Sequence, residues 1–413
     1  MKFQSIRGTR DLFGVDIEKH KKIQNLVSQF AKVNNFIELQ TPIFEYTELF
    51  LKPLGEQSDV VLKEMYTFKD RNDDFLTLRP EYTTPMIRAA ISNNLLSSLP
   101  LKVYGIGPMF RRERPQKGRY RQFNQINFEI FGSNDYISDL ELISLGNDIL
   151  KSIIPETKYV LNINSLGNRE DLINYKNLLR NYFEKNKKNL SEESELKINL
   201  NPLRILDSKI DEDIEVCKNA PLIQDHISKE SKLHFLSIKK GLDYYGIEYY
   251  ENNNLVRGLD YYCSTVFEFK TDDLGSQDTL LGGGRYDGLI NTLGGPNIPG
   301  IGWAAGIERI ALLMNKEDNN LNNVHIAINN ENFKDYLIKI MKYLKYNNIS
   351  FYWNYKYNLK KSLSKANADN AKYIIIIGDN EFKNEFYTVR NLITGEQTEL
   401  NINNISSFIN DKS

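Results

Sequence analysis

The spacing of apolar residues predicts a helix near the start of the chain. Between residues 16 and 36 the apolar side chains recur at positions i, i+3, i+4 and i+7, the pattern of a helix that buries one face. The residues that set this pattern are Ile23, Leu26, Val27 and Phe30. Residues 37–44 then have a strand-like composition interrupted by Pro42, which has no N–H to give to a sheet.

Alternation with period two predicts two long strands in the middle of the chain. Residues 102–112 and 120–131 have the composition of the two arms of a hairpin. The second arm sorts its side chains onto two faces. One face carries Ile126, Phe128 and Ile130, and the other carries Arg121, Phe123, Gln125 and Glu129. We therefore expect a strand with its apolar face on the core and its polar face toward a ligand.

Turn and cap signals predict a corner and an insertion. A short strand over 76–80 ends near Glu81, where Thr84 is expected to cap a helix that has Pro85 at its first position. Residues 168–241 are mostly helical in pattern and strongly charged, which indicates an insertion between two pieces of one domain. Strand signals return at 255–269, a glycine-rich stretch covers 282–306, and a helix is expected over 307–314.

The last quarter of the chain has a different pattern. Residues 315–323 are polar and lack periodicity, so we predict a linker there. Beyond it, strands at 324–328, 349–353 and 373–377 alternate with helices near 333–344 and 359–368, an order typical of a small α/β domain. The four consecutive isoleucines at 374–377 are expected to form a central strand covered on both faces.

Composition narrows the class of protein. A chain of 413 residues with 41% hydrophobic and 26% charged residues has room for two or three globular domains. No apolar run is long enough to cross a bilayer and the first residues lack the apolar core of a signal peptide, so we expect a cytoplasmic protein with no membrane contact. The two cysteines and four histidines are scattered, so neither a disulfide framework nor a metal site built from His or Cys is expected.

The loop between the two predicted hairpin strands is strongly basic. Residues 111–121 contain six Arg or Lys and one Glu, or 6 − 1 = +5, in a chain whose net charge is −1. Like charges at this density repel one another unless a polyanion neutralises them. The alternative is a solvated basic turn beside an ordinary amphipathic strand, and the charge alone does not decide between the two.

A glycine pattern at residues 300–305 fits the G-x-G-x-x-A form of a dinucleotide-binding fingerprint. The preceding residues, 293–299, contain two glycines and two prolines and cannot form the buried strand that this motif requires. We interpret the match as coincidental. The sequence has no P-loop pattern either, so a nucleotide site must be of another kind.

Several segments resemble class II aminoacyl-tRNA synthetases. Residues 110–125, which begin Phe-Arg-Arg-Glu-Arg-Pro, resemble the second motif of that class, and residues 300–314, with Gly-Ile-Glu-Arg at 306–309, resemble the third. The segments Leu-Val-Arg-Gly-Leu-Asp-Tyr-Tyr at 255–262 and Gly-Gly-Arg-Tyr-Asp-Gly-Leu at 283–289 resemble the signatures of histidyl-tRNA synthetases, and 7–11 and 64–68 also fit. Tyr82 and Asn124 depart from the family pattern, which often has a small residue and a histidine there.

This resemblance implies an α+β fold with two domains. Residues 1–319 would form a class II catalytic domain, an antiparallel sheet flanked by helices with a helical insertion at about 168–240, and residues 320–413 an α/β anticodon-binding domain. The segment around Pro42 resembles the first class motif, which implies a homodimer. The implied reaction joins histidine to the 3′ end of tRNA(His) through histidyl-adenylate, with ATP and Mg²⁺ as substrate and no tightly bound cofactor.

The resemblance also implies roles for single residues. Arg111 would hold the α-phosphate of ATP, Arg309 the γ-phosphate, and Arg257 the α-phosphate from the other side, since guanidinium is planar, charged and bidentate. Further ATP contacts are implied for Glu113, Arg119, Arg121 and Phe123, with the Phe123 ring stacked on adenine. Histidine would contact Glu81, Thr83, Gln125, Glu129, Tyr261, Tyr262 and Tyr286. Gln116 would meet the acceptor end of the tRNA.

Each of these residues also has a purely structural reading. Arg257 could pair with Asp260, Arg309 with Glu308 or Glu317, and Arg285 with Asp287 in a turn; Glu81 could bind a helix N-terminus, and Tyr261 and Tyr262 could be core aromatics. At the level of the protein, the alternatives are a catalytically inactive relative resembling the regulatory subunit of the first histidine-biosynthesis enzyme, and an RNA-sensing module. The presence of Arg257, Arg309 and the domain after residue 323 favours the enzyme.

Overall fold

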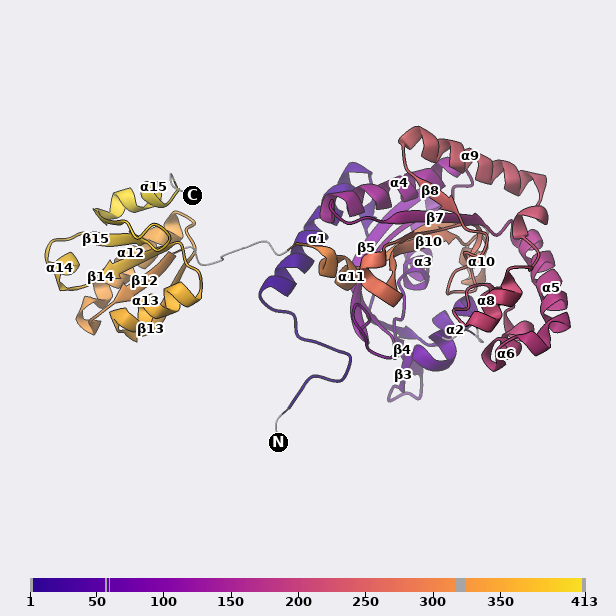
Figure 1. Cartoon of the computed structure of the whole chain (residues 1–413), viewed down its shortest axis with the longest axis horizontal. Helices are drawn as coiled ribbons and strands as arrows, with labels where there is room; N and C mark the ends of the chain where they lie inside the picture. The colour runs from indigo at the N-terminus through magenta and orange to yellow at the C-terminus, as the bar shows by residue number, and fades with distance from the viewer. Residues whose placement is uncertain (1–2, 56–57, 59, 316–323, 411–413) are drawn as a thin grey trace. The chain divides into compact units, whose positions relative to one another are not determined.

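The computed structural model describes residues 3–55, 58, 60–315 and 324–410. The chain divides into two compact units, Met1–Asn315 and Lys316–Ser413, which are described separately (Figure 1). The linker predicted at 315–323 and the domain boundary expected at residue 319 fall almost entirely outside the described residues.

The first unit is organised around an eight-stranded sheet with the order β1-β5-β6-β11-β10-β9-β7-β8. All of its pairs are antiparallel except those at the two edges, β1 with β5 and β7 with β8. The strands are β1 (Ile37–Glu38), β5 (Leu101–Phe110), β6 (Gln122–Phe131), β7 (Val160–Ser165), β8 (Tyr249–Glu251), β9 (Cys263–Lys270), β10 (Thr279–Arg285) and β11 (Gly300–Gly306). The antiparallel sheet expected for the fold is therefore present.

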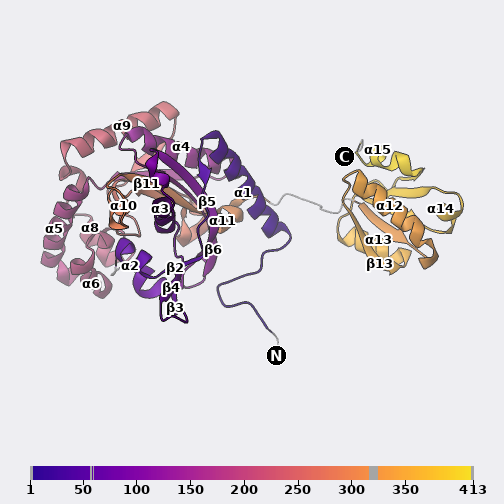
Figure 2. The ribbon, with the colours of Figure 1, turned by 180° about the vertical axis from the view of Figure 1, so that it is seen from behind.

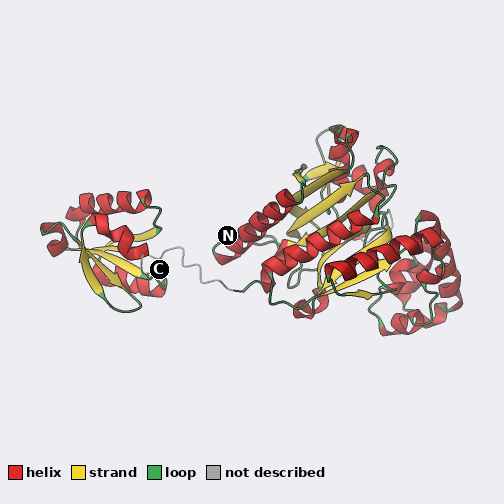
Figure 3. Cartoon of the chain, turned by 90° about the horizontal axis from the view of Figure 1, so that it is seen from above, coloured by secondary structure: helices red, strands yellow, loops and turns green. Residues whose placement is uncertain are grey.

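Helices cover one face of this sheet (Figure 3). They are α1 (Val15–Val33), α4 (Tyr136–Ile153), α9 (Lys229–Tyr245) and α11 (Ile307–Leu313). Ile126, Phe128 and Ile130 of β6 point into the core beneath them, with at most 2% of each side chain exposed. The prediction that one face of this strand lies on the core is confirmed, and the helix predicted over 16–36 corresponds to α1.

The opposite face of the sheet is covered near one end by α3 (Thr83–Ser92) and α10 (Leu289–Thr292). Figure 2 shows both helices from behind. The predicted cap of α3 is wrong in detail, because the helix begins at Thr83 and the carboxylate of Glu81 accepts the backbone N–H groups of Thr83 and Thr84. Glu81 therefore performs the capping task that the sequence assigned to Thr84.

The strand predicted over 37–44 is two separate strands. Residues Ile37–Glu38 pair in the large sheet, whereas β2 (Phe44–Tyr46) belongs to a three-stranded sheet with β4 (Phe75–Leu78) and β3 (Tyr66–Lys69). Between the two strands, the carbonyl groups of Thr41 and Pro42 accept hydrogen bonds from the Arg79 side chain at 2.9 and 3.3 Å. The chain leaves one sheet for the other at the proline, which cannot donate to either. Next to this sheet lie α2 (Glu48–Leu54) and a π-helical turn, η1 (Val60–Glu64).

The helical insertion has a core of its own. Its helices are α5 (Arg169–Lys185), α6 (Glu192–Leu200), α7 (Leu203–Leu206) and α8 (Asp211–Cys217), followed by α9. Leu179, Phe183, Ile198 and Ile205 are buried in this core. At its entrance Asn168 and Asp171 form a reciprocal capping box, with the Asp171 N–H donating to Asn168 Oδ1 at 2.9 Å. The helical character predicted for residues 168–241 is confirmed.

The second unit contains a five-stranded sheet with the order β13-β12-β14-β15-β16. Strands β12 (Val324–Ile328), β13 (Phe351–Tyr357) and β14 (Tyr373–Ile377) are parallel and alternate with α12 (Lys334–Tyr346) and α13 (Leu359–Ala368), which confirms the predicted β-α-β-α-β order. The isoleucine strand β14 lies between β12 and β15, as expected. The prediction missed the antiparallel strands β15 (Tyr387–Asn391) and β16 (Gln397–Leu400). Helix α14 (Asp379–Lys383) lies between β14 and β15, and α15 (Ile405–Asn410) follows β16.

Candidate active site

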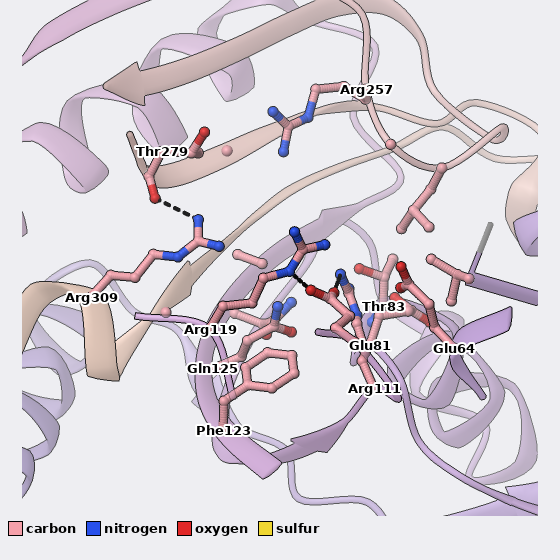
Figure 4. A pocket seen from close by; sticks show the side chains of 18 of the residues that line it. Glu64, Glu81, Thr83, Arg111, Arg119, Phe123, Gln125, Arg257, Thr279 and Arg309 are labelled. Atoms are coloured by element: carbon pink, nitrogen blue, oxygen red, sulfur yellow. Dashed lines mark hydrogen bonds and ion pairs between the residues drawn. The ribbon is translucent and has the colours of Figure 1, made fainter. Parts of the chain in front are cut away.

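One pocket in the first unit collects most of the residues that the sequence singled out. Its walls come from β6, β10, β11 and the start of α11, from the corner before α3, and from the loop that precedes β9 (Figure 4). The predicted residues on its walls are Glu81, Thr83, Arg111, Glu113, Arg119, Phe123, Gln125, Arg257, Tyr261, Tyr262 and Arg309. Segments from residue 81 to residue 309 therefore meet at one site.

Three arginines from the basic hairpin and α11 face one side of the pocket. Arg111 donates from Nε to the carbonyl of Pro80 at 2.8 Å, and its guanidinium lies over the Phe123 ring at 5.7 Å. Arg309 donates to the carbonyls of Gly118 and Thr279 at 3.2 and 2.9 Å, which ties α11 to the hairpin loop and to β10. Arg119 pairs with Glu113, which also lies 3.8 Å from Arg111. Backbone carbonyls and the Glu113 carboxylate thus help to hold these three cations in place.

The positive charge on this side exceeds what the pocket itself neutralises. Burial lowers the pKa of Arg309, and the nearby charges of Arg119 and Arg111 lower it further. Burial also lowers the pKa of Arg119; Glu64 acts in the opposite direction and Arg111 in the same direction. Guanidinium stays charged under ordinary conditions, so these shifts reflect burial first and repulsion between the neighbouring arginines second. An anion with several negative oxygens would relieve that repulsion.

Arg257 enters the pocket from a separate loop (Figure 4). Its NH1 lies 3.4 Å from Glu268 of β9, and among the described residues its buried Nε has no hydrogen-bond partner. Burial is the largest single effect and lowers the pKa of Arg257, but Glu268, together with Tyr262, Tyr261 and Asp207, raises that pKa overall. The expected alternative, a pair with Asp260, is not what the structure shows.

Two buried carboxylates lie at the other end of the pocket. Glu81 accepts the Thr83 and Thr84 N–H groups at 2.7 and 3.0 Å, and burial raises its pKa. Glu129 accepts the Thr83 hydroxyl at 2.7 Å and the hydroxyl of Tyr286. Burial raises the pKa of Glu129 to about 8, so this carboxyl holds a proton at neutral pH until a cation arrives.

Glu129 and Tyr286 do not reach the pocket wall and lie directly behind it. Both are fully buried, and Thr83 connects Glu129 to the pocket. The rings of Tyr261, Tyr262 and Tyr286 pack against one another, with centroids 4.6 to 6.4 Å apart. Most of the histidine-binding residues predicted from the sequence are thus connected, through Thr83, Glu129 and Tyr286, although only part of them line the pocket.

The glycine pattern at 300–305 has a steric cause. A side-chain carbon at Gly302 would lie 1.5 Å from the Glu129 carboxylate, and one at Gly300 would lie 2.3 Å from the Tyr286 ring. Both glycines belong to strand β11, with Gly300 at its first position. Because no strand-to-helix phosphate turn exists here, the interpretation of the fingerprint as coincidental is confirmed, and the glycines make room for Glu129 and Tyr286.

Two predicted residues lie away from the pocket wall. The Arg121 side chain donates to the carbonyl of Glu113 at 3.3 Å and packs beside Gly8. Gln116 is exposed at the tip of the hairpin loop, where its backbone pairs with Arg119. Gln116 therefore does not line the pocket. Arg121 supports the hairpin loop from its outer side.

The structure settles most of the structural alternatives. Glu308 accepts the backbone and side-chain N–H groups of Asn124 at 2.9 to 3.0 Å instead of pairing with Arg309, so the departure at Asn124 joins β6 to α11. Arg285 is buried on Asp139 at 3.0 and 3.1 Å, with Asp287 only at 4.0 Å. Glu317 lies outside the described residues.

Tyr82, the other departure, is 1% exposed in the core under the Arg79 guanidinium, at 4.1 Å, and does not line the pocket.

Several residues that line the pocket were not predicted as site residues, among them the polar residues Glu64, Tyr120, Asn127, Arg204, Thr279 and Glu308. Asn127 had a signal, because it lies between Gln125 and Glu129 on the same face of β6. Arg204 had none, since it belongs to the insertion and reaches the pocket only through the tertiary fold.

Comparisons with known proteins agree with this geometry. The histidyl-tRNA synthetase family model matches residues 8–310, and an anticodon-binding domain model matches residues 323–412. The chain is 44% identical to the histidine–tRNA ligase of Ehrlichia chaffeensis over 97% of its own length and 96% of the relative, and 44% identical to that of Wolbachia pipientis subsp. Culex pipiens over 95% and 96%.

Solved structures give the same picture. The apo histidyl-tRNA synthetase of S. aureus superimposes with a TM-score of 0.81 at 32% identity, covering 99% of this chain and 100% of that one. A Bacillus halodurans protein described as an ATP phosphoribosyltransferase regulatory subunit/histidyl-tRNA synthetase shares the fold, with a TM-score of 0.66 at 19% identity over 92% of this chain and 99% of that one.

Proposed function

The chain belongs to the histidyl-tRNA synthetase family, and we propose that the pocket described above is where it joins histidine to tRNA. The activity is that of a histidine–tRNA ligase: ATP and histidine form histidyl-adenylate with release of pyrophosphate, and the histidyl group then passes to the 3′ end of tRNA(His). The observation that carries the assignment of the site is the presence of Arg111, Arg257 and Arg309 on the walls of one pocket.

The arginines act on the triphosphate. When the histidine carboxylate attacks the α-phosphorus of ATP, negative charge builds on that phosphoryl group as the bond to pyrophosphate breaks. Arg111 and Arg257 stabilise that charge from two sides, and Arg309 holds the γ-phosphate. Each such fixed donor is worth about 3 to 4 kcal/mol in a site without water. ATP enters as its magnesium complex, so Mg²⁺ arrives as part of the substrate.

The basic hairpin holds the rest of the nucleotide. Phe123 lies beneath Arg111, and a flat adenine stacks between this ring and the guanidinium of Arg309, which approaches from α11. Glu113 holds Arg119 and Arg111 in their positions, and Arg121 fixes the loop through the Glu113 carbonyl. We assign Arg111, Glu113, Arg119, Arg121 and Phe123 to ATP binding and its support.

The carboxylate end of the pocket binds histidine. Glu81 has its carboxylate turned toward the helix N-terminus and the pocket, so it and the Thr83 hydroxyl take the α-amino group. Gln125 lines the pocket and takes the carboxylate through its amide Nε2, which is a hydrogen-bond donor. Glu129 with Tyr261, Tyr262 and Tyr286 surrounds the imidazole. Sites built from buried hydrogen-bonding groups reject ligands that lack the partner atoms by about 10⁴ to 10⁵.

The tRNA meets two parts of the chain. The terminal adenosine enters beside the hairpin loop, where the exposed Gln116 is available to contact it. The second unit, matched by the anticodon-binding domain model, holds the anticodon end. Neutralisation of RNA phosphates releases counterions, so binding weakens as salt rises.

The three-stranded sheet provides a surface for a second copy of the chain. Phe44, Tyr46 and Phe68 share one face of this sheet, and between 46% and 61% of each side chain is exposed. Large apolar side chains gathered on one exposed face typically mark an interface. We propose that this face forms the homodimer contact.

Histidine-dependent exchange of pyrophosphate into ATP tests the function. The purified protein should incorporate labelled pyrophosphate into ATP when histidine is present and not with other amino acids. A well-folded protein that shows no exchange with any amino acid would instead be the inactive regulatory type of relative. Exchange without charging of tRNA(His) would limit the function to the first step.

A further inference from the structure

The loop that carries Arg257 has no regular secondary structure. Residues 252–262 form neither a helix nor a strand, so their position depends on side-chain contacts. The start of the loop is fixed by Asn164, whose Nδ2 donates to the carbonyl of Leu255 at 3.1 Å. Within the described part of the chain, the guanidinium of Arg257 pairs with Glu268, at 3.4 Å.

The middle of the loop is held by the helical insertion. Asn201, between α6 and α7, donates from Nδ2 to Asp260 Oδ1 at 2.7 Å. Arg204 of α7 donates to the carbonyl of Gly258, the residue after Arg257. These two contacts join segments that are more than fifty residues apart in the sequence, on either side of the arginine that faces the pocket.

The insertion is a firm support for these contacts. Leu203, Ile205 and Leu206, the neighbours of Arg204, are buried in the insertion core with at most 6% exposed. Leu255 and Val256 of the loop are buried in the same core. The segment before Arg257 is therefore packed as part of the insertion, although Arg257 itself lies in the catalytic pocket.

There is little free space on the opposite side of Arg257. A side-chain carbon at Gly282 of β10 would lie 2.2 Å from the NH2 atom of Arg257. The guanidinium lies directly on the strand, so a shift of the loop backbone moves it along β10 and away from Glu268. An arginine that must contact one phosphate tolerates little displacement, since misplacement by about 1 Å can cost on the order of a hundredfold in rate.

We propose that Asn201 and Arg204 of the insertion are positioning residues for adenylate formation, which hold the Arg257 loop so that its guanidinium meets the α-phosphate. This inference rests on the proposed function of Arg257. It gives the insertion a role in the first step of the reaction, before any tRNA is bound. Neither residue needs to touch a substrate for this role.

Asn201→Ala and Arg204→Ala test the proposal in single-turnover adenylate formation with the full chain. Each should slow the chemical step tenfold or more while the histidine KM in exchange changes less than threefold. Asn199→Ala and Arg180→Ala are matched controls, because their side chains donate hydrogen bonds to Glu184 and Asn177 within the insertion and not to the Arg257 loop. Both controls should keep the wild-type rate.

The decisive arm uses Arg257→Ala as background. If Asn201 and Arg204 act through Arg257, their substitution should change the remaining rate less than twofold in that background. An equal further loss there would overturn the proposal, because it would indicate a general structural effect. The exchanged pair Asn201→Asp with Asp260→Asn restores a hydrogen bond with donor and acceptor reversed, and should recover most of the rate that Asn201→Asp alone removes.

The outcome separates this inference from the proposed function. Wild-type exchange that depends on histidine, together with unchanged rates in Asn201→Ala and Arg204→Ala, would reject the positioning role and leave the enzyme standing. Absence of histidine-dependent exchange in the wild type would reject both. Thermal unfolding of each variant, expected within about 2 °C of wild type, distinguishes a misplaced loop from an unfolded insertion.

Discussion

At the scale of single residues, Arg257 carries the most specific prediction. Arg257→Ala removes one of the two cations assigned to the α-phosphate, so adenylate formation should slow by about 10² to 10³. Histidine binding should stay within a few-fold of wild type, because the carboxylates that we propose to hold histidine are unchanged in this variant. Single-turnover kinetics and calorimetry measure the two effects, and a near-normal rate would remove Arg257 from the catalytic residues.

Glu129 gives a prediction about pH. With its pKa raised to about 8 by burial, the carboxyl is protonated in the free pocket at pH 7 and ionises when it accepts an N–H from the ligand. Histidine binding at pH 7 should therefore release on the order of one proton, and affinity should rise between pH 6 and 8 and then level off. Calorimetry in buffers of different ionisation enthalpy measures this release.

Glu129→Gln is the control for that measurement. The amide oxygen accepts from one of the two hydroxyls of Thr83 and Tyr286, and its NH2 donates to the other. Because the amide has no proton to lose, proton release should fall by the amount that Glu129 supplied. Equal release from wild type and variant would show that another group titrates and that Glu129 is already ionised in the free pocket.

At the scale of elements, strand β11 shows what the sequence could and could not predict. The alternation in β6 correctly placed Phe123, Gln125 and Glu129 on one face, because side-chain direction in a strand follows from position alone. The sequence was enough to reject the glycines of β11 as a dinucleotide-binding fingerprint. The reason for these glycines depends on Glu129, on the neighbouring strand β6, and on Tyr286, directly after β10. Period and composition cannot reveal such a neighbour.

The same limit explains the other misses. Arg204 and Glu268 lie near Arg257 only because the insertion and β9 fold against its loop, and neither has a local pattern. The strand break at Pro42 was visible in the sequence, yet the transfer of the chain to a second sheet was not. Helices and strands with strong periodicity were predictable from the pattern of residues. Contacts between distant segments were predictable only where the family resemblance implied them.

Gly302→Ala tests the steric role of β11. The new methyl group would overlap the Glu129 carboxylate and lie 2.7 Å from the Phe128 carbonyl, so Glu129 must move. We expect the histidine KM to rise at least tenfold while the ATP KM changes little. Circular dichroism should show that the fold is retained. An unchanged histidine KM would mean that Glu129 is not in the histidine site.

At the scale of the whole molecule, we propose that the first unit forms the adenylate and the second unit binds the anticodon. A chain that ends at Asn315 retains the complete first unit and should keep histidine-dependent exchange within about threefold. Charging of tRNA(His) should fall tenfold or more, mainly through a higher KM for tRNA, because the anticodon contacts are lost. Undiminished charging would reject an anticodon role for the second unit.

The homodimer is tested by light scattering. The full chain of 48.0 kDa should give a molar mass of twice that value. Tyr46→Asp, on the exposed face of the three-stranded sheet, should lower the measured mass toward that of the monomer. Tyr244→Asp is the matched control, because Tyr244 is 91% exposed on α9 and lies outside the proposed contact. Loss of the dimer in both variants, or in neither, would reject this surface.

The proposed function depends most on the convergence of three guanidinium groups on one triphosphate beside a histidine site. A crystal structure with ATP and histidinol tests it directly, because histidinol has no carboxylate to attack the phosphorus and leaves the nucleotide intact. We expect Arg111 and Arg257 on the α-phosphate, Arg309 on the γ-phosphate, and the imidazole between Glu129 and the tyrosines. A triphosphate bound without contact to Arg257, or an imidazole outside that cluster, would contradict it.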